Sequence, residues 1–375
     1  MRYEPLLAER PIATDTLPLE VAVVVPTLNE AANIEALIAQ LSVVLAGRGW
    51  EVVFVDDNSG DGTSDVVRRI GRTARHVRIV QRVGRRGLSS AVVEGILATA
   101  APVVAVMDGD LQHGEDALPR LIAEIEGGQT DIAVGTRYAD GGSTGNWDAR
   151  REAMSRLATR LGQVALGTSV SDPMSGFFAI RRDAFESALP RLSAIGFKIL
   201  LDILASAPQP LRVAEVPYTF RERTAGESKI GAKVLADYAE LIADKTIGRL
   251  IPVRLLKFLM VGGMGVFVHL AVLSALLSAG NVFLTAQTGA VVTAIAFNFF
   301  LNNSFTYADR KLKGWSIARG LASFYAISAL GAVANIGIGN WMAGHDERWW
   351  VAGVAGVLVG AIWNFAMSSA LTWRK

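Results

Sequence analysis

The chain up to residue 216 alternates short apolar runs with longer segments in which apolar residues recur every three or four positions. The short runs are rich in β-branched residues and are bounded by turn-forming residues, a pattern typical of buried strands. They predict strands at residues 19–25, 52–55, 77–80, 103–107, 131–134, 177–180 and 211–216. The longer segments, such as Ile34 to Leu45, predict amphipathic helices. This alternation predicts an α/β domain with a mostly parallel sheet.

Thr27, Leu28, Asn29 and Glu30 follow the first predicted strand. A Thr with a Glu three positions later has the form of a capping box, in which each side chain bonds a backbone N–H of the first helical turn. The spacing therefore predicts that the first helix starts at these residues.

Carboxylate side chains stand directly after several of the predicted strands. They are Glu30, Asp56, Asp57, Asp108 and Asp110. In open parallel sheets, ligands bind beyond the carboxyl ends of the strands. The convergence of these acids predicts a binding site at that edge of the sheet.

Three of the oxygen donors fall within five positions, at Asp108, Asp110 and Gln112, with Gly109 between the two acids. Two carboxylates and one amide suit a hard divalent cation that keeps coordination positions open for phosphate oxygens. A solvated turn is the alternative interpretation. The segment favours a metal–diphosphate site, and hence a nucleotide-activated substrate.

The pattern changes after about residue 250. Four segments contain no Asp, Glu, Lys or Arg: residues 258–280, 282–301, 320–344 and 349–373. A helix needs about 20 apolar residues to cross a bilayer. The segments predict four transmembrane helices, with buried helices of a large soluble domain as the alternative.

Basic residues give these spans an orientation. They precede the first span, lie between the second and third, and follow the last: Lys245, Arg249, Arg254, Lys257, Arg310, Lys311, Lys313, Arg319, Arg374 and Lys375. The positive-inside rule places these segments and both termini in the cytosol. The stretch from 238 to 256 is amphipathic and is either a helix on the membrane surface or a linker helix.

Composition narrows the class of protein. Hydrophobic residues make up 51% and charged residues 19%, which is too apolar for an ordinary soluble protein. The net charge of +2 gives no sign of nucleic-acid binding, and the chain has no cysteine for disulfides, thiolate zinc sites or cysteine nucleophiles. No apolar signal sequence precedes Leu19, so we expect a multi-pass protein of the cell membrane with its first domain in the cytosol.

A metal-bound diphosphate next to a membrane suggests sugar transfer from a nucleotide-sugar to a lipid. A lipid phosphate, whose second pKa is about 6, needs no general base but does need cations to position it. Arg137, Arg151 and Ser155 are candidates for that role, and a solvated helix face is the alternative for the last two. Arg223 and Lys229, in a polar loop, either close over the donor diphosphate or form a solvated basic loop.

Several motifs occur together and in order. They are VVPTLNE at 24–30, VDDNSGDGT at 55–63, GLSSA at 87–91, DGDLQH at 108–113, GTR at 135–137, DPMSG at 172–176 and GESK at 226–229. With these motifs the chain resembles family 2 glycosyltransferases of the GT-A fold, and most closely the dolichol-phosphate (polyprenyl-phosphate) mannose synthases. The last 120 or so residues resemble the four-span GtrA-like domain that some of these enzymes carry.

The resemblance implies a role for each matching residue. Those that hold the nucleoside are Pro26, Leu28, Glu30, Val55 and Asp57. Those that bind Mg²⁺ or Mn²⁺ are Asp108, Asp110 and Gln112, with Gly109 in the same donor-binding segment. Arg223 and Lys229 engage the donor diphosphate. Arg137, Arg151 and Ser155 engage the lipid phosphate, and with Asp110 they form the implied catalytic set.

The implied reaction moves mannose from GDP-mannose to a polyprenyl or dolichyl phosphate with inversion, giving a polyprenyl β-D-mannosyl phosphate and GDP at the cytosolic membrane face. We therefore expect an N-terminal extension at 1–18, a GT-A domain at 19–231, interface helices at 232–256 and a GtrA-like domain at 257–375.

Two other functions are compatible with the same residues. The donor is alternatively UDP-glucose or another UDP-sugar, and the four spans alternatively flip the glycolipid. A dinucleotide-binding domain is disfavoured, because no Gly-x-Gly-x-x-Gly follows the first strand. The sequence leaves open the length of the lipid, the oligomeric state and the pathway.

Overall fold

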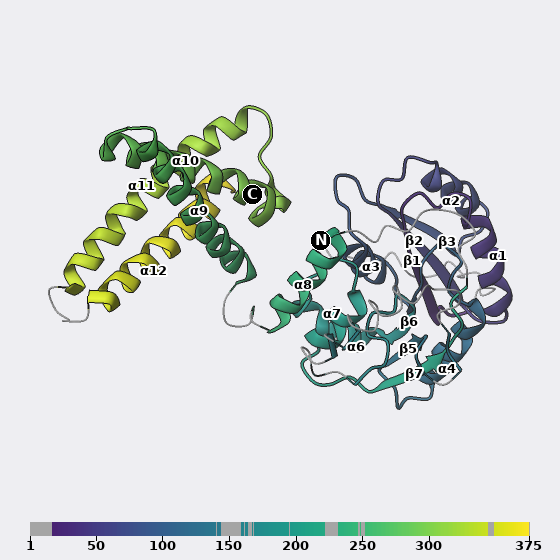
Figure 1. The fold of residues 1–375 in the computed structure, drawn as a ribbon. Coiled ribbons are helices and arrows are strands. Elements are labelled where there is room, and N and C mark those ends of the chain that lie inside the picture. Colours follow the sequence, from purple (N-terminus) through teal and green to yellow (C-terminus); the bar gives the residue numbers. More distant parts are fainter. Residues whose placement is uncertain are drawn as a thin grey trace, which may run out of the picture. The chain divides into compact units, whose positions relative to one another are not determined.

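The computed structural model describes residues 17–139, 141–143, 159–160, 162–163, 167, 169–194, 196–221, 232–246, 248, 252–343 and 349–374. It divides into two compact units, residues 1–246 and 247–375. The first is an α/β unit and the second is helical, so the fold class expected from the sequence is confirmed (Figure 1).

The first unit is built on a seven-stranded sheet in the order β3-β2-β1-β4-β6-β5-β7. The strands are β1 Val21–Thr27, β2 Trp50–Asp56, β3 Val77–Gln81, β4 Val103–Val106, β5 Ile132–Thr136, β6 Phe178–Arg181 and β7 Val213–Pro217. Only β6 is antiparallel to its neighbours, β4 and β5. Because Phe178 pairs with Val106, the residues that precede β6 lie at the edge where β4 ends.

Helices cover both faces of this sheet (Figure 1). Those on one face are α1 Ile34–Val44, α2 Thr63–Gly71 and α4 Leu118–Glu126. Those on the other are α3 Leu88–Leu97, α6 Arg182–Ala188 and α7 Ile199–Ser206. Successive residues of a strand point to opposite faces, so Val23 joins the first core and Val24 the second. This two-sided burial explains why the strands read as unbroken apolar runs.

The predicted capping box is wrong. Helix α1 begins at Ile34, and Asn33 precedes it without a side-chain capping bond. Thr27 belongs to β1 instead, with its Oγ1 3.3 Å from Asp56 Oδ1, and the Glu30 N–H donates to Thr63 Oγ1 at 3.0 Å. These polar groups bond the last residue of β2 and the first residue of α2, so they fix the edge of the sheet rather than start a helix.

Helix α8, Ala232–Thr246, closes the first unit. Its Tyr238 and Leu241 pack with Leu201 of α7 and with Met174. Lys245, in its last turn, pairs with Asp202 of α7 at 2.7 Å. The helix is therefore joined to the α/β unit by both apolar contacts and a buried ion pair.

The second unit contains α9 Val253–Ser278, α10 Phe283–Leu301, α11 Trp315–Ala343 and α12 Trp349–Met367. Three helices of the described part are long and apolar enough to span a membrane: Val253–Ser278, Phe283–Thr306 and Trp315–Val333. The apolar stretch described near the C-terminus, Gly356–Thr372, is shorter. Helices α10 and α12 each continue into a π-helical turn, and the aromatic rings after those turns, Tyr307 and Trp373, stack at 4.2 Å.

Candidate active site

The Asp108 segment lies where β4 ends, as predicted. Leu111 takes a left-handed conformation, with φ of 60°, which turns the chain sharply after the two acids. Asp110 is buried and its Oδ1 accepts the Gln112 backbone N–H at 3.1 Å, whereas the Asp108 side chain is 37% exposed. One carboxylate is thus buried and accepts a backbone N–H, and the other is partly exposed to solvent.

The same segment touches the end of β1. A Cβ atom on Gly109 would lie 3.3 Å from Val25 Cγ1, 3.4 Å from Thr27 Cγ2 and 3.7 Å from Glu30 Cγ. A Cβ atom on Gly176 would lie 3.1 Å from Asp108 Oδ2. The two glycines therefore allow the backbone to approach closely on either side of Asp108.

Gln112 links this segment to the predicted basic loop. Its Nε2 donates to the Arg221 carbonyl at 3.0 Å, and its own carbonyl accepts the Arg221 N–H at 2.9 Å. Arg221 in turn pairs with Glu115 at 2.7 Å. The two predicted cations that follow, Arg223 and Lys229, lie outside the described residues.

The oxygen donors of Asp108, Asp110 and Gln112 fit a divalent cation whose remaining ligands come from a phosphate. Within the described residues, no group of three or more His, Cys, Asp or Glu side chains is placed to hold a metal ion. Two carboxylates and an amide oxygen leave several of the six or more positions of Mg²⁺ or Mn²⁺ to other oxygens. The set is therefore suited to a cation that arrives with a diphosphate rather than to a permanent structural metal.

His113 is a residue of the site to which the sequence assigned no role. It is buried, its ring stacks on Phe177 with centroids 5.1 Å apart, and its Nδ1 accepts the Asp108 N–H at 3.1 Å. Burial lowers the pKa of His113, against the opposing effect of Asp108 and Asp110, so the ring stays neutral. Its place directly after the acidic motif was the only signal in the sequence.

Arg137 follows β5, and the structure places it against a carboxylate. Its Nε and Nη2 donate to the two oxygens of Asp172 at 2.7 and 2.9 Å, and Asp172 is fully buried. Its guanidinium also lies over the ring of Phe220 at 5.6 Å. Burial disfavours the charged form of Arg137, but the hydrogen bonds with Asp172 outweigh it and raise its pKa. A ligand here would meet a fixed, permanently charged donor.

The other two residues predicted to contact the lipid phosphate, Arg151 and Ser155, lie outside the described residues. The structure therefore brings together Asp108, Asp110, Gln112 and the Arg137–Asp172 pair around His113, whose surroundings include all four charged groups.

A pocket of about 740 Å³ opens beyond the ends of β1 and β2. It is lined by Leu28, Asn29, Asn58, Gly60, Asp61 and Arg86. Leu28 was predicted to hold a nucleoside, and Arg86 was not. Pro26 and Val55, also predicted to hold the nucleoside, pair with each other in the sheet. Val55 is fully buried in the core, so Val55 supports this edge without exposing a surface to a ligand.

Asp57 is held by a buried arginine. Arg82 Nη1 lies 2.5 Å from Asp57 Oδ1, and the Gly87 N–H donates to Asp57 Oδ2 at 2.7 Å. Arg82 is only 1% exposed and also donates to Ser90 Oγ at 2.6 Å. Both oxygens of Asp57 thus anchor the start of α3, a role that the sequence did not indicate.

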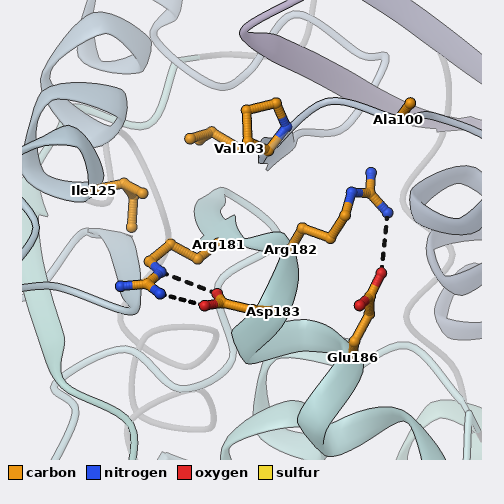
Figure 2. Close-up of a pocket in the computed structure, with 8 residues that line it drawn as sticks. Ala100, Val103, Ile125, Arg181, Arg182, Asp183 and Glu186 are labelled. Atoms are coloured by element: carbon orange, nitrogen blue, oxygen red, sulfur yellow. Dashed lines mark hydrogen bonds and ion pairs between the residues drawn. The ribbon is translucent and has the colours of Figure 1, made fainter.

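A second pocket, of about 560 Å³, lies at the opposite edge of the sheet, where β4 begins at Val103 (Figure 2). Its charged groups bond one another: Arg181 with Asp183, and Arg182 with Glu186. None of the predicted site residues lines it. The candidate active site is therefore at the carboxyl ends of β1, β2 and β4.

Comparison with known proteins gives two family matches. Residues 22–189 match the glycosyl transferase family 2 model, and residues 257–373 match the GtrA/DPMS transmembrane domain. The dolichol-phosphate mannosyltransferase of Pyrococcus furiosus is 34% identical over 95% of this chain and 99% of its own length. That of Saccharomyces cerevisiae is 36% identical over 61% of this chain and 87% of its own length.

A solved structure, the glucosyl-3-phosphoglycerate synthase of Mycobacterium tuberculosis, is similar with a TM-score of 0.47 and 20% identity, covering 60% of this chain and 79% of the other.

Proposed function

Since the chain belongs to the dolichol-phosphate mannosyltransferase family, with a family 2 glycosyl transferase domain and a GtrA/DPMS transmembrane domain, we propose that it transfers mannose from GDP-mannose to the phosphate of a polyprenyl phosphate. The observation that carries the proposal is that the partly exposed carboxylate of Asp108 and the pocket at Leu28 lie at one edge of the sheet. One nucleotide-sugar can then reach both, with its nucleoside at β1 and β2 and its diphosphate at β4.

In this proposal Asp108, Asp110 and Gln112 hold Mg²⁺ or Mn²⁺. When bound, the cation offsets the negative charge that develops on the departing diphosphate. The protein contributes the geometry: the Gln112 N–H fixes Asp110, and the neutral His113 ring fixes the backbone of Asp108. The Asp110 carboxylate and the backbone of Asp108 are then in place before the donor arrives, which reduces reorganisation during the reaction.

The acceptor side supplies orientation rather than proton transfer. A lipid phosphate is largely dianionic at neutral pH, so an oxygen of that phosphate can attack the anomeric carbon directly. The bond from that carbon to the diphosphate oxygen of GDP breaks as the new carbon–oxygen bond forms, which inverts the configuration. Arg137 positions the phosphate, with Arg151 and Ser155 as the further proposed contacts, and Arg223 and Lys229 engage the departing diphosphate.

A donor panel tests the proposed reaction. The purified full-length protein is incubated with polyprenyl phosphate and radiolabelled GDP-mannose or UDP-glucose, with Mn²⁺ present. We expect labelled lipid from GDP-mannose alone. Transfer from UDP-glucose but not from GDP-mannose would refute the proposed donor.

The same proposal assigns the reaction to the cytosolic side of the membrane. Basic residues precede the first apolar helix, and the positive-inside rule assigns such segments to the cytosol. The chain has no cysteine, so single cysteines report topology cleanly. In intact cells, Lys313→Cys should resist an impermeant maleimide and Asn281→Cys should react with it. The reverse pattern would place the active site outside the cytosol.

A further inference from the structure

Lys198 is a second cation, besides Arg137, that lies close enough to Asp108 and Asp172 to interact with their charges. It directly precedes α7, and its Nζ donates to the Met174 carbonyl at 3.4 Å. Met174 belongs to the turn from Asp172 to Gly176. The two ends of this turn carry the partner of Arg137 and the glycine that faces Asp108. Lys198 is thus held against the segment that lines the acceptor side of the site.

The charge of Lys198 acts on the same groups. Burial lowers its pKa most, Arg137 lowers it further, and Asp172 and Asp108 raise it. A partly buried ammonium is costly unless anions or acceptors surround it. Among the described residues its one hydrogen bond is the long one to a carbonyl, which leaves donor capacity toward the site.

Asp202 anchors the first turn of α7. Its N–H donates to the Lys198 carbonyl at 3.1 Å, and its fully buried carboxylate accepts the Ala194 N–H at 2.8 Å and the Ser193 hydroxyl at 2.9 Å. The Gly196 carbonyl accepts the Ser89 N–H at 3.2 Å, which joins the segment before Lys198 to α3. The backbone on both sides of Lys198 is therefore fixed, with Asp202 as the main fixed point.

Helix α8 completes this anchor. Lys245 reaches Asp202 at 2.7 Å with a side chain only 7% exposed, and it also donates to the Arg191 carbonyl at 2.7 Å. One turn earlier, Leu241 packs in the cluster that includes Met174. The helix thus supports both groups on which the position of Lys198 depends, the carboxylate of Asp202 and the turn at Met174.

We propose that Lys198 is a further substrate-binding residue that contacts phosphate oxygens, and that Asp202 and Lys245 are positioning residues that hold it at the site. The inference rests on the proposed function for the location of the site. In this proposal α8 does more than connect the first unit to the membrane helices. Its Lys245 helps to position Lys198, through Asp202, for contact with a phosphate of the substrate. Both the donor diphosphate and the lipid phosphate have the chemistry that Lys198 would bind.

The test is a double-mutant cycle on the purified full-length protein. Its variants are Lys198→Met, Lys245→Met and the double variant, with Lys198→Arg as the charge-conserving control and Lys311→Met as an exposed lysine outside the site. Two equilibrium dissociation constants are measured, for GDP and for farnesyl phosphate, together with mannosyl transfer and the melting temperature.

We expect Lys198→Met to weaken binding of one of the two phosphates about 10- to 100-fold, as the loss of a charged hydrogen bond does. The phosphate that loses affinity identifies the source that Lys198 contacts. Lys198→Arg should stay within a few-fold of the native affinity, and Lys311→Met should match it. Lys245→Met should weaken the same binding by less, and it should add nothing in the Lys198→Met background, because its effect passes through Lys198.

Unchanged affinity for both phosphates in Lys198→Met would overturn the role of Lys198. An equal effect of Lys245→Met in both backgrounds would overturn its positioning role and assign it to stability alone. Failure of the native protein to transfer mannose would count against the proposed function only, because the binding constants decide the role of Lys198 independently.

Discussion

The two ends of the sheet both carry arginine–aspartate pairs, yet only one end has the features of a site. At the carboxyl end of β5, the Arg137 side chain is 10% exposed and Asp172 is fully buried. At the opposite end, Arg181 is 35% and Asp183 66% exposed, and the two residues lie only two positions apart (Figure 2). The first pair joins residues 35 positions apart in the chain.

This difference shows that paired charges alone do not mark an active site. The exposed pair is local and solvated, so it contributes little to stability. The buried pair costs desolvation, and it stands beside Asp108, whose side chain is partly exposed to solvent. A chemical site is indicated where buried, fixed charges surround one that is available to a ligand.

The sharpest contrast between the two ends comes from matched aspartates. Asp110→Ala should reduce mannosyl transfer at least about 1000-fold, because it removes both a proposed metal ligand and the acceptor that fixes Gln112. Asp183→Ala should change transfer less than twofold. Initial rates with GDP-mannose and polyprenyl phosphate provide the comparison, and equal rates for the two variants would remove the distinction between the ends.

Removal of divalent cations tests the same end without a substitution. EDTA should abolish transfer, and Mn²⁺ or Mg²⁺ should restore it. The melting temperature of the protein without nucleotide should hardly change, because Asp110 and His113 are held by protein groups. Full activity in EDTA would exclude the proposed role of Asp108, Asp110 and Gln112.

The buried and exposed ion pairs should also differ in stability. Asp172→Asn leaves the Arg137 guanidinium buried without its counter-charge, a loss of about 3–5 kcal/mol. For a unit of this size, that lowers the melting temperature by roughly 6–20 °C. Asp183→Asn, in the exposed pair, should lower it by about 2 °C or less. Similar melting temperatures for the two variants would contradict the contrast in burial.

The smallest expected effect is on the stability of the protein in acid. The hydrogen bond between Asp183 and Arg181 lowers the pKa of Asp183, against a weaker opposing effect of burial. A depressed carboxyl pKa stabilises the fold above the ordinary value of about 3.8, and that contribution is lost as pH falls below it. The native protein should therefore lose slightly more stability than Asp183→Asn between pH 5 and 3, by at most about 0.5 kcal/mol after solvent screening. A greater acid loss in the variant would reverse the sign of this effect.

The sequence predicted those parts of the fold that depend on local pattern. Apolar β-branched runs located the strands, and the acids after β4 lie at its carboxyl edge as expected, because a residue that follows a strand must lie at the end of that strand. The capping box failed because Thr27 and Glu30 bond the end of β2 and the start of α2, tertiary contacts that compete with the local motif.

The local pattern of apolar and polar residues did not predict contacts between positions that are far apart in the sequence. Asp172 meets Arg137 because β6 enters the sheet antiparallel, and nothing in its four residues indicates that direction. Likewise, Arg82 reads as one of several arginines in a polar stretch until the fold brings it to Asp57. Lys198 is a single lysine before α7 in the sequence, and the sequence does not show that Asp202 and Lys245 pair beside it.

The anomeric configuration of the product shows whether the lipid phosphate attacks the donor directly. The native full-length protein is given GDP-mannose and polyprenyl phosphate, and the mannosyl lipid is analysed by the one-bond carbon–hydrogen coupling at the anomeric carbon. Direct attack by the lipid phosphate predicts a β-mannosyl phosphate and no α product. An α-linked product, or mannose attached to a group other than the lipid phosphate, would exclude direct attack by the lipid phosphate.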